Sequence, residues 1–244
     1  MAFLSILQLF ALFGIGWLGR RLGMLGEAEE HGVSRFCVHI LFPCFAFSTI
    51  IEGFDPDRLA EVWMLPLLGF GLMAAGGVAG IFLRRGLKSR DPEVARAFHH
   101  ICAINNFGFL PIFIIENTMG KAALSLFFCF NLGSTFGYWT IGILTLGGGA
   151  GMRETLRRLV TPGIISVLLA LGCAFAGAKG WMPAGVMRVI SYAGAPSIPL
   201  MIMLTGCAMF QPLHRAFLRD LIYTSGVRLA LLPACSPGCG WCRW

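Results

Sequence analysis

The sequence has 244 residues, of which 57% are hydrophobic and only 13% are charged, and its formal net charge is +7. A soluble domain carries roughly 25% charged residues, so this chain lacks the polar groups needed to cover itself in water. The composition excludes a soluble globular domain and indicates an all-α integral membrane protein. The basic excess does not require a nucleic-acid partner, because Lys and Arg of membrane proteins concentrate in the cytoplasmic loops.

Eight apolar segments are candidate membrane spans, since a bilayer core about 30 Å thick needs about 20 apolar residues as a helix. In chain order they cover residues 3–18, 36–51, 62–83, 99–116, 122–146, 161–178, 189–210 and 221–234. The first has no basic region before it and is followed by Arg20 and Arg21, so we interpret it as a retained span and not as a signal peptide. In the third, Gly76 and Gly80 form a small-xxx-small pair that predicts close packing of another helix.

Basic residues alternate between the links that join these spans. The odd-numbered links hold 13 Lys and Arg residues, and the even-numbered links hold 4. Because cytoplasmic loops carry the basic excess, the pattern places the odd links in the cytoplasm and the N-terminus outside. The sequence thus predicts a multi-pass membrane protein, and we expect it in the cell inner membrane.

An internal repeat relates the second span to the seventh. GVSRFCVHILFPCFAFSTIIEG (32–53) aligns without gaps with GVMRVISYAGAPSIPLMIMLTG (185–206), and Pro43 falls opposite Pro196. The two copies are five spans apart, so they enter the membrane from opposite sides. Such inverted repeats are typical of secondary transporters.

The fourth span is interrupted by polar and helix-breaking residues in AINNFGFLPIF (103–113). Pro111 cannot donate a backbone hydrogen bond, and Gly108 lets the chain bend. The freed backbone groups, with Asn105 and Asn106, would form a polar pocket in which a helix N-terminus favours a carboxylate. The alternative is a proline kink whose asparagines are hydrogen-bonded between helices.

Three stretches resemble a known transporter family. INNFGFLPIFIIE (104–116) and FNLGSTFGYWTIGIL (130–144) are similar to the fourth and fifth spans of bacterial members of the auxin efflux carrier family, and RFCVHILFPCFAFSTI (35–50) is similar to the second. The resemblance implies inverted five-helix repeats, as in bile acid and auxin carriers. In each repeat the fourth helix is broken, and asparagines where the breaks cross bind a small organic anion such as a carboxylate.

The resemblance also implies a division of the chain and a set of site residues. Residues 1–146 would form the first five-helix repeat, 147–160 a cytoplasmic linker, 161–234 an incomplete second repeat and 235–244 an atypical tail. The family has ten helices, whereas this sequence stops during the eighth and ends in PACSPGCGWCRW (233–244), so we expect a truncated or frameshifted reading frame. The implied substrate-binding residues are Asn105, Asn106, Gly108, Pro111 and Asn131, and the paired helix-break prolines are Pro43 and Pro196.

Two further residues are candidates for the site. His39 precedes Pro43 by one turn and could handle protons or contact substrate, or it could be a buried, hydrogen-bonded histidine. Arg228 lies inside the eighth span, where its charge is costly unless it pairs, reaches the interface or faces a cavity that attracts an anion. Cys235, Cys239 and Cys242 are only loosely spaced like zinc ligands, so we expect no metal and no cofactor.

These observations lead to two function hypotheses. The first is a secondary carrier for a small organic anion, which works by alternating access around the broken fourth helix. The alternative is a non-transporting, truncated membrane protein or subunit that only associates with other membrane helices. An enzyme is not expected, because the spans contain no HExxH, no GxSxG and no paired carboxylates. A homodimer within the lipid bilayer is a further expectation.

Overall fold

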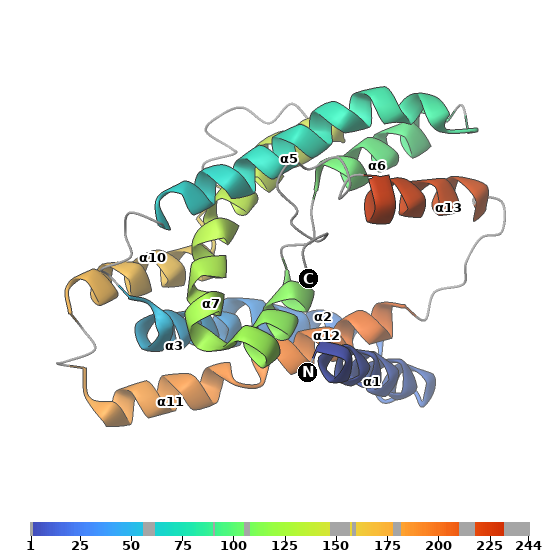
Figure 1. Cartoon of the computed structure of the whole chain (residues 1–244). Helices are drawn as coiled ribbons and strands as arrows, with labels where there is room; N and C mark the ends of the chain where they lie inside the picture. Colours follow the sequence, from blue (N-terminus) through green and yellow to red (C-terminus); the bar gives the residue numbers. More distant parts are fainter. Residues whose placement is uncertain are drawn as a thin grey trace. The chain divides into compact units, whose positions relative to one another are not determined.

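The computed structural model describes residues 2–55, 62–89, 91–104, 108–146, 157, 160–177, 182–209 and 218–231, and the fold is given for these residues. All of the regular structure in this part of the chain is helical. The helices are α1 (Ala2–Arg21), α2 (Glu27–Phe36), α3 (Phe42–Gly53), α5 (Met64–Leu83), α6 (Pro92–Ala103), α7 (Phe109–Gly137), α8 (Ile143–Thr145), α10 (Pro162–Phe175), α11 (Ala184–Gly194), α12 (Ser197–Ala208) and α13 (Leu218–Gly226) (Figure 1). Short π-helical and 3₁₀ segments extend several of them: η1 (Cys37–Leu41), η3 (Arg84–Gly86), η4 (Tyr138–Gly142) and η7 (Val227–Leu231).

Five helical stretches in the described residues are long and apolar enough to cross a membrane. They cover Phe3–Arg21, Glu27–Gly53, Met64–Gly86, Phe109–Thr145 and Ala184–Ala208, and Pro162–Phe175 is a shorter apolar helix. The all-helical membrane class predicted from the sequence is confirmed, whereas the count of eight spans stays a prediction. The 37-residue stretch Phe109–Thr145 contains a non-helical residue, Gly120, with φ 79° and ψ −175°. Gly120 lies in the link between the fourth and fifth predicted spans.

The described residues form two compact units. The first contains residues 1–67, 106–133 and 158–211, and the second contains residues 68–105, 134–157 and 212–244. The first unit therefore holds α1, α2, α3, α10, α11, α12 and the N-terminal part of α7. The second holds most of α5, together with α6, α8 and α13.

Glycines let α1 and α12 pack closely in the first unit, where Figure 1 shows the two helices side by side. A Cβ atom added to Gly16 would lie 1.8 Å from the carbonyl oxygen of Met203, and one added to Gly206 would lie 2.2 Å from that of Phe13. Both distances are far shorter than a van der Waals contact, so each helix requires a glycine where the other crosses it. The rest of this unit's core is aliphatic and aromatic and includes Ile50, Leu124, Phe128, Ala170, Ile198 and Ile202.

The second unit has its own small core around Phe98, Cys102 and Val227. Tyr223 of α13 stacks on the Phe98 ring of α6 with ring centroids 5.6 Å apart, and its hydroxyl donates to the carbonyl oxygen of Leu83 at 3.0 Å. The close packing expected at Gly76 is present, since a Cβ there would lie 2.3 Å from the carbonyl oxygen of Cys102. Helix α6 is thus held between α5 and α13.

Candidate functional site

The helical structure of the fourth predicted span is interrupted. Helix α6 begins at Pro92, where the Asp91 side chain accepts a hydrogen bond from the backbone N–H of Glu93 at 2.8 Å, and it ends at Ala103. Ile104 is extended, with φ −91° and ψ 114°, and helical structure resumes with α7 at Phe109. Asn105 and Asn106, the central residues of the predicted site, lie outside the described residues.

An arginine covers the carbonyl end of α6 in the second unit. Arg228 donates from Nη1 to the carbonyl oxygen of Cys102 at 3.3 Å and from Nη2 to that of Ile104 at 2.5 Å. The last carbonyls of a helix have no partner within the helix and carry partial negative charge, so a guanidinium satisfies both needs. The half-buried charge of Arg228 therefore has backbone partners directly before the interruption.

Helix α7 begins in the first unit with residues that anchor it in the core. The Phe109 ring meets the Phe42 ring edge to face at 5.4 Å, and Ile112 and Phe113 are both buried. Pro111 lies in the first turn, where the missing N–H costs nothing because the first backbone N–H groups have no helical partner. Gly108 is a half-buried bend residue directly before the helix.

The two paired prolines both lie where helical geometry changes. Pro43 is in the first turn of α3, directly after π-helical η1, and its carbonyl oxygen accepts a hydrogen bond from Ser166 Oγ at 2.5 Å. Pro196 is the N-cap residue of α12, after α11 ends at Gly194. π-helical segments occur frequently at functional sites.

The segments that carry these prolines contact each other within the first unit. A Cβ atom added to Gly194 would lie 2.5 Å from the backbone nitrogen of Phe45, so α11 and α3 meet backbone to backbone. The Cys37 thiol donates to the carbonyl oxygen of Ser197 at 3.3 Å, and both residues are buried. The two aligned copies therefore cross beside their prolines.

The remaining candidates have separate environments. His39 is exposed, and its Nδ1 lies 2.9 Å from the carbonyl oxygen of Arg35 on its own helix. Asn131 is half-buried in α7, two residues before Gly133, where an added Cβ would lie 1.7 Å from the carbonyl oxygen of Pro66. Ser134 is fully buried, and its hydroxyl has no hydrogen-bond partner in the part of the chain that the structure describes.

Sequence reasoning missed Ser134, although it follows Asn131 by one helical turn in FNLGS. Serine is common in membrane helices, so the residue type alone carries no signal. The spacing of three residues from Asn131 could have placed both on one face of the helix.

No metal centre is evident in the described ranges, where no three or more His, Cys, Asp or Glu side chains gather closely enough to hold an ion. The three tail cysteines, Cys235, Cys239 and Cys242, lie outside those ranges. What the described residues offer is an interrupted helix with a basic side chain at its carbonyl end.

Known sequences resemble this chain over most of its length. The sequence model of a family described as "Membrane transport protein" matches residues 1–154. An uncharacterized transporter of Methanothermobacter thermautotrophicus is 23% identical over 242 residues, which cover 96% of this chain and 76% of that protein. An uncharacterized transporter of Methanocaldococcus jannaschii is 20% identical over 208 residues, which cover 84% of this chain and 68% of that protein.

Proposed function

The chain belongs to the membrane transport protein family, and we propose that it is a secondary carrier for a small organic anion such as a carboxylate. The family match is in line with the resemblance to auxin efflux carriers, and with the apolar helices it makes the chain a multi-pass membrane protein. Both relatives described above are named as uncharacterized transporters. The substrate class and the mechanism are the parts that we propose.

The observation that supports a carrier most directly is the interruption between Ala103 and Phe109. In hydrocarbon each backbone N–H and C=O must be satisfied, so irregular backbone is tolerated only where protein or a water-filled cavity supplies partners. A chain that needed only a membrane anchor would gain nothing from this cost. Substrate sites of secondary transporters are built from such discontinuous helices.

The residues around the interruption suit an anion. The carboxamides of Asn105 and Asn106 each supply two N–H donors, and Gly108 and Pro111 would shape the bend. Arg228, bonded to the carbonyl of the residue before Asn105, brings a positive charge to the same stretch of chain. A carboxylate is the simplest organic group that accepts from several donors and is attracted by the arginine.

Alternating access would follow from the proposed inverted repeats, residues 1–146 and 161–234. One part of the protein would rock against the other around a fixed site. The contact of the Pro43 and Pro196 segments is compatible with such a pair of copies. We propose the cell inner membrane as its location, and the alternation of Lys and Arg between links supports an N-terminus outside.

Flux of labelled carboxylates into proteoliposomes tests this proposal. The substitutions Asn105→Ala and Asn106→Ala are each expected to lower uptake about tenfold, because a hydrogen bond to a charged group contributes roughly 1.5–3 kcal/mol. Asn117→Ala is a matched control: Asn117 lies in α7 but donates to the carbonyl oxygen of Phe113 in its own helix at 2.7 Å. Uptake should stay near the wild-type level in this control.

Failure of the proposal would be visible in the same assay. If folded protein in the vesicles moves no carboxylate, or if the three asparagine variants transport alike, the proposed site is wrong. Absence of any flux would favour the alternative of a non-transporting membrane subunit. Co-purification with other membrane proteins would then be the next measurement.

A further inference from the structure

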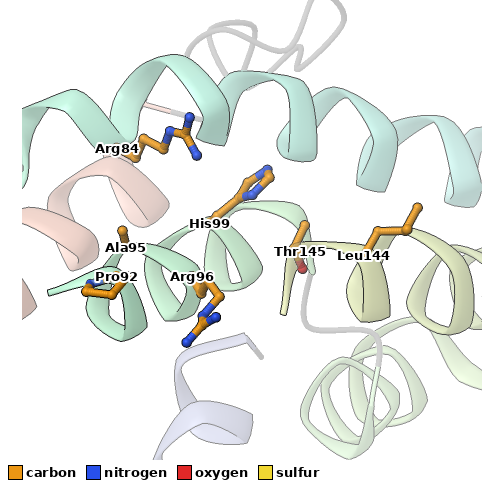
Figure 2. Close-up of a pocket in the computed structure, with 7 residues that line it drawn as sticks. All are labelled: Arg84, Pro92, Ala95, Arg96, His99, Leu144 and Thr145. Carbon is orange, nitrogen blue, oxygen red and sulfur yellow. The ribbon is translucent and has the colours of Figure 1, made fainter. Parts of the chain in front are cut away.

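The second unit contains a cavity that the transport proposal does not use. It has a volume of about 330 Å³ and is lined by Arg84, Pro92, Ala95, Arg96, His99, Leu144 and Thr145 (Figure 2). These residues come from three segments: the 3₁₀ turn η3 after α5, helix α6 between Pro92 and His99, and the end of α8. From the positions of the lining residues and their surroundings, we propose that this cavity binds the phosphate group of an anionic phospholipid in the cytoplasmic leaflet.

The cavity lies at an end of the apolar helix α5. The candidate span Met64–Gly86 closes with Arg84 and Arg85. The link that follows carries the largest basic excess in the chain, so the positive-inside pattern places this end at the cytoplasmic face. Basic pockets between membrane helices on this side bind anionic lipid headgroups.

Arg84 supplies the main positive charge. Its side chain is exposed, and it makes no ion pair with another described residue. Figure 2 shows Arg84 and His99 on the same side of α6, whereas the Arg96 guanidinium extends from the other side. Arg96 lies 3.6 Å from the Glu93 carboxylate, which offsets its charge. A guanidinium with free donors fits a phosphate through two parallel hydrogen bonds.

His99 and Thr145 are held in place around the cavity. His99 Nε2 donates to the carbonyl oxygen of Gly77 at 2.8 Å, because that oxygen can only accept, and this bond holds the imidazole at the cavity wall. The Thr145 hydroxyl is buried and donates to the carbonyl oxygen of Gly142 at 2.7 Å. These hydrogen bonds hold His99 and Thr145 in position and do not involve the N–H donors of Arg84.

Apolar surface beside the charges favours a lipid over a soluble phosphate. Leu144, which lines the cavity, is 68% exposed, and Phe82, two residues before Arg84, is 61% exposed. In a membrane these side chains face acyl chains. A phospholipid can satisfy both parts of this surface at once, with its phosphate at Arg84 and its chains along the apolar side chains. Inorganic phosphate can bind Arg84 but has no apolar chain to contact the apolar side chains.

Native mass spectrometry of the purified full chain tests the proposal. Wild-type protein should retain phosphatidylglycerol adducts in preference to phosphatidylcholine. Arg84→Gln should weaken phosphatidylglycerol binding about tenfold, since it removes the charge-assisted hydrogen bonds to the phosphate. Arg85→Gln is the matched control, because Arg85 is its exposed neighbour on the same turn and does not line the cavity. Arg85→Gln should bind as wild type does.

A second variant and a second ligand keep the test decisive. Arg84→Lys keeps the charge but loses the two-pronged geometry, so its affinity should lie between those of wild type and Arg84→Gln, and it guards against a folding defect in the latter. If Arg84→Gln and Arg85→Gln lose phosphatidylglycerol binding equally, the proposed site is wrong. If inorganic phosphate displaces the lipid at millimolar concentration in an Arg84-dependent manner, the lipid assignment is wrong. None of these outcomes depends on transport.

Discussion

The guanidinium of Arg228 binds the carbonyl end of α6, with Nη1 3.3 Å from the carbonyl oxygen of Cys102 and Nη2 2.5 Å from that of Ile104. Residues 102 and 228 are far apart in sequence, yet this contact joins the eighth predicted span to the point where the fourth one breaks. It explains how a charge inside an apolar segment is accommodated: the helix end supplies the acceptors that hydrocarbon cannot.

Replacing Arg228 by methionine should destabilise the second unit. The change removes both hydrogen bonds and leaves two carbonyls of the broken helix end without their donors. We expect a loss of about 2 kcal/mol in the free energy of unfolding, the usual scale for bonds to a charged donor. Thermal unfolding of the purified protein in detergent measures this. The unfolding temperature of Arg228→Lys, which can keep one hydrogen bond, should lie between those of the wild-type protein and Arg228→Met.

Arg188→Met is the matched control for the loss of a positive charge, because Arg188 is an exposed arginine on α11. Its unfolding temperature should stay close to that of the wild-type protein. Identical unfolding of the Arg228→Met and wild-type proteins would show that the contact contributes nothing to stability.

Replacing either of two glycines of α11 by alanine should change the free energy of unfolding, but in opposite directions. A Cβ atom at Gly194 would lie 2.5 Å from the Phe45 nitrogen, whereas one at Gly185 would meet nothing within 4 Å. Gly194→Ala should therefore force α11 away from α3. We expect the free energy of unfolding to fall by about 1–3 kcal/mol, the range for overpacked sites. Gly185→Ala should stabilise by up to about 1 kcal/mol through helix propensity.

Thermal unfolding of both variants, together with maleimide labelling of the buried Cys37, measures this contact. Cys37 bonds to the backbone of Ser197 at the crossing, so separation of the two segments should speed its labelling. Equal labelling rates in the two glycine variants would mean that the segments do not meet there.

Gly120 marks the turn between the fourth and fifth predicted spans. Its φ of 79° and ψ of −175° lie in a region that only glycine occupies readily, and an added Cβ would touch nothing within 4 Å. Gly120→Ala should therefore cost about 1–3 kcal/mol through backbone strain alone. Gly172→Ala, also with open space around it but inside α10, has no such strain and should not destabilise. Unfolding in denaturant compares the two.

How much the sequence could predict depends on the kind of interaction. Apolar runs predicted helices in the right places, but α2 begins at Glu27, well before the predicted span 36–51. The stretch EAEEHGVSRF is polar, yet it is rich in helix formers and extends the helix beyond the apolar run towards the N-terminus. Hydropathy predicts the apolar part of a helix and not the residue where the helix begins.

The contacts of the candidate site could not be read from the sequence. Gly108 and Pro111 predicted a break near residues 104–109 because their backbone chemistry is local. The acceptors of Arg228 are backbone carbonyls, which every residue has, so nothing in the sequence distinguishes Cys102 and Ile104. Likewise Arg84 and Leu144 line one cavity from distant segments, and no local pattern links them.

The ion pair between Glu52 and Lys121 joins the end of α3 to the residue after Gly120, at 2.5 Å between Oε2 and Nζ. Both side chains are more than a third exposed, so solvent screens the pair and its contribution is expected to be below about 1 kcal/mol. Lys121→Glu should lower the unfolding temperature slightly and more at low salt, because two carboxylates then face each other. The double reversal, Glu52→Lys with Lys121→Glu, should restore it. A double variant no more stable than Lys121→Glu alone would show that these two charges do not interact.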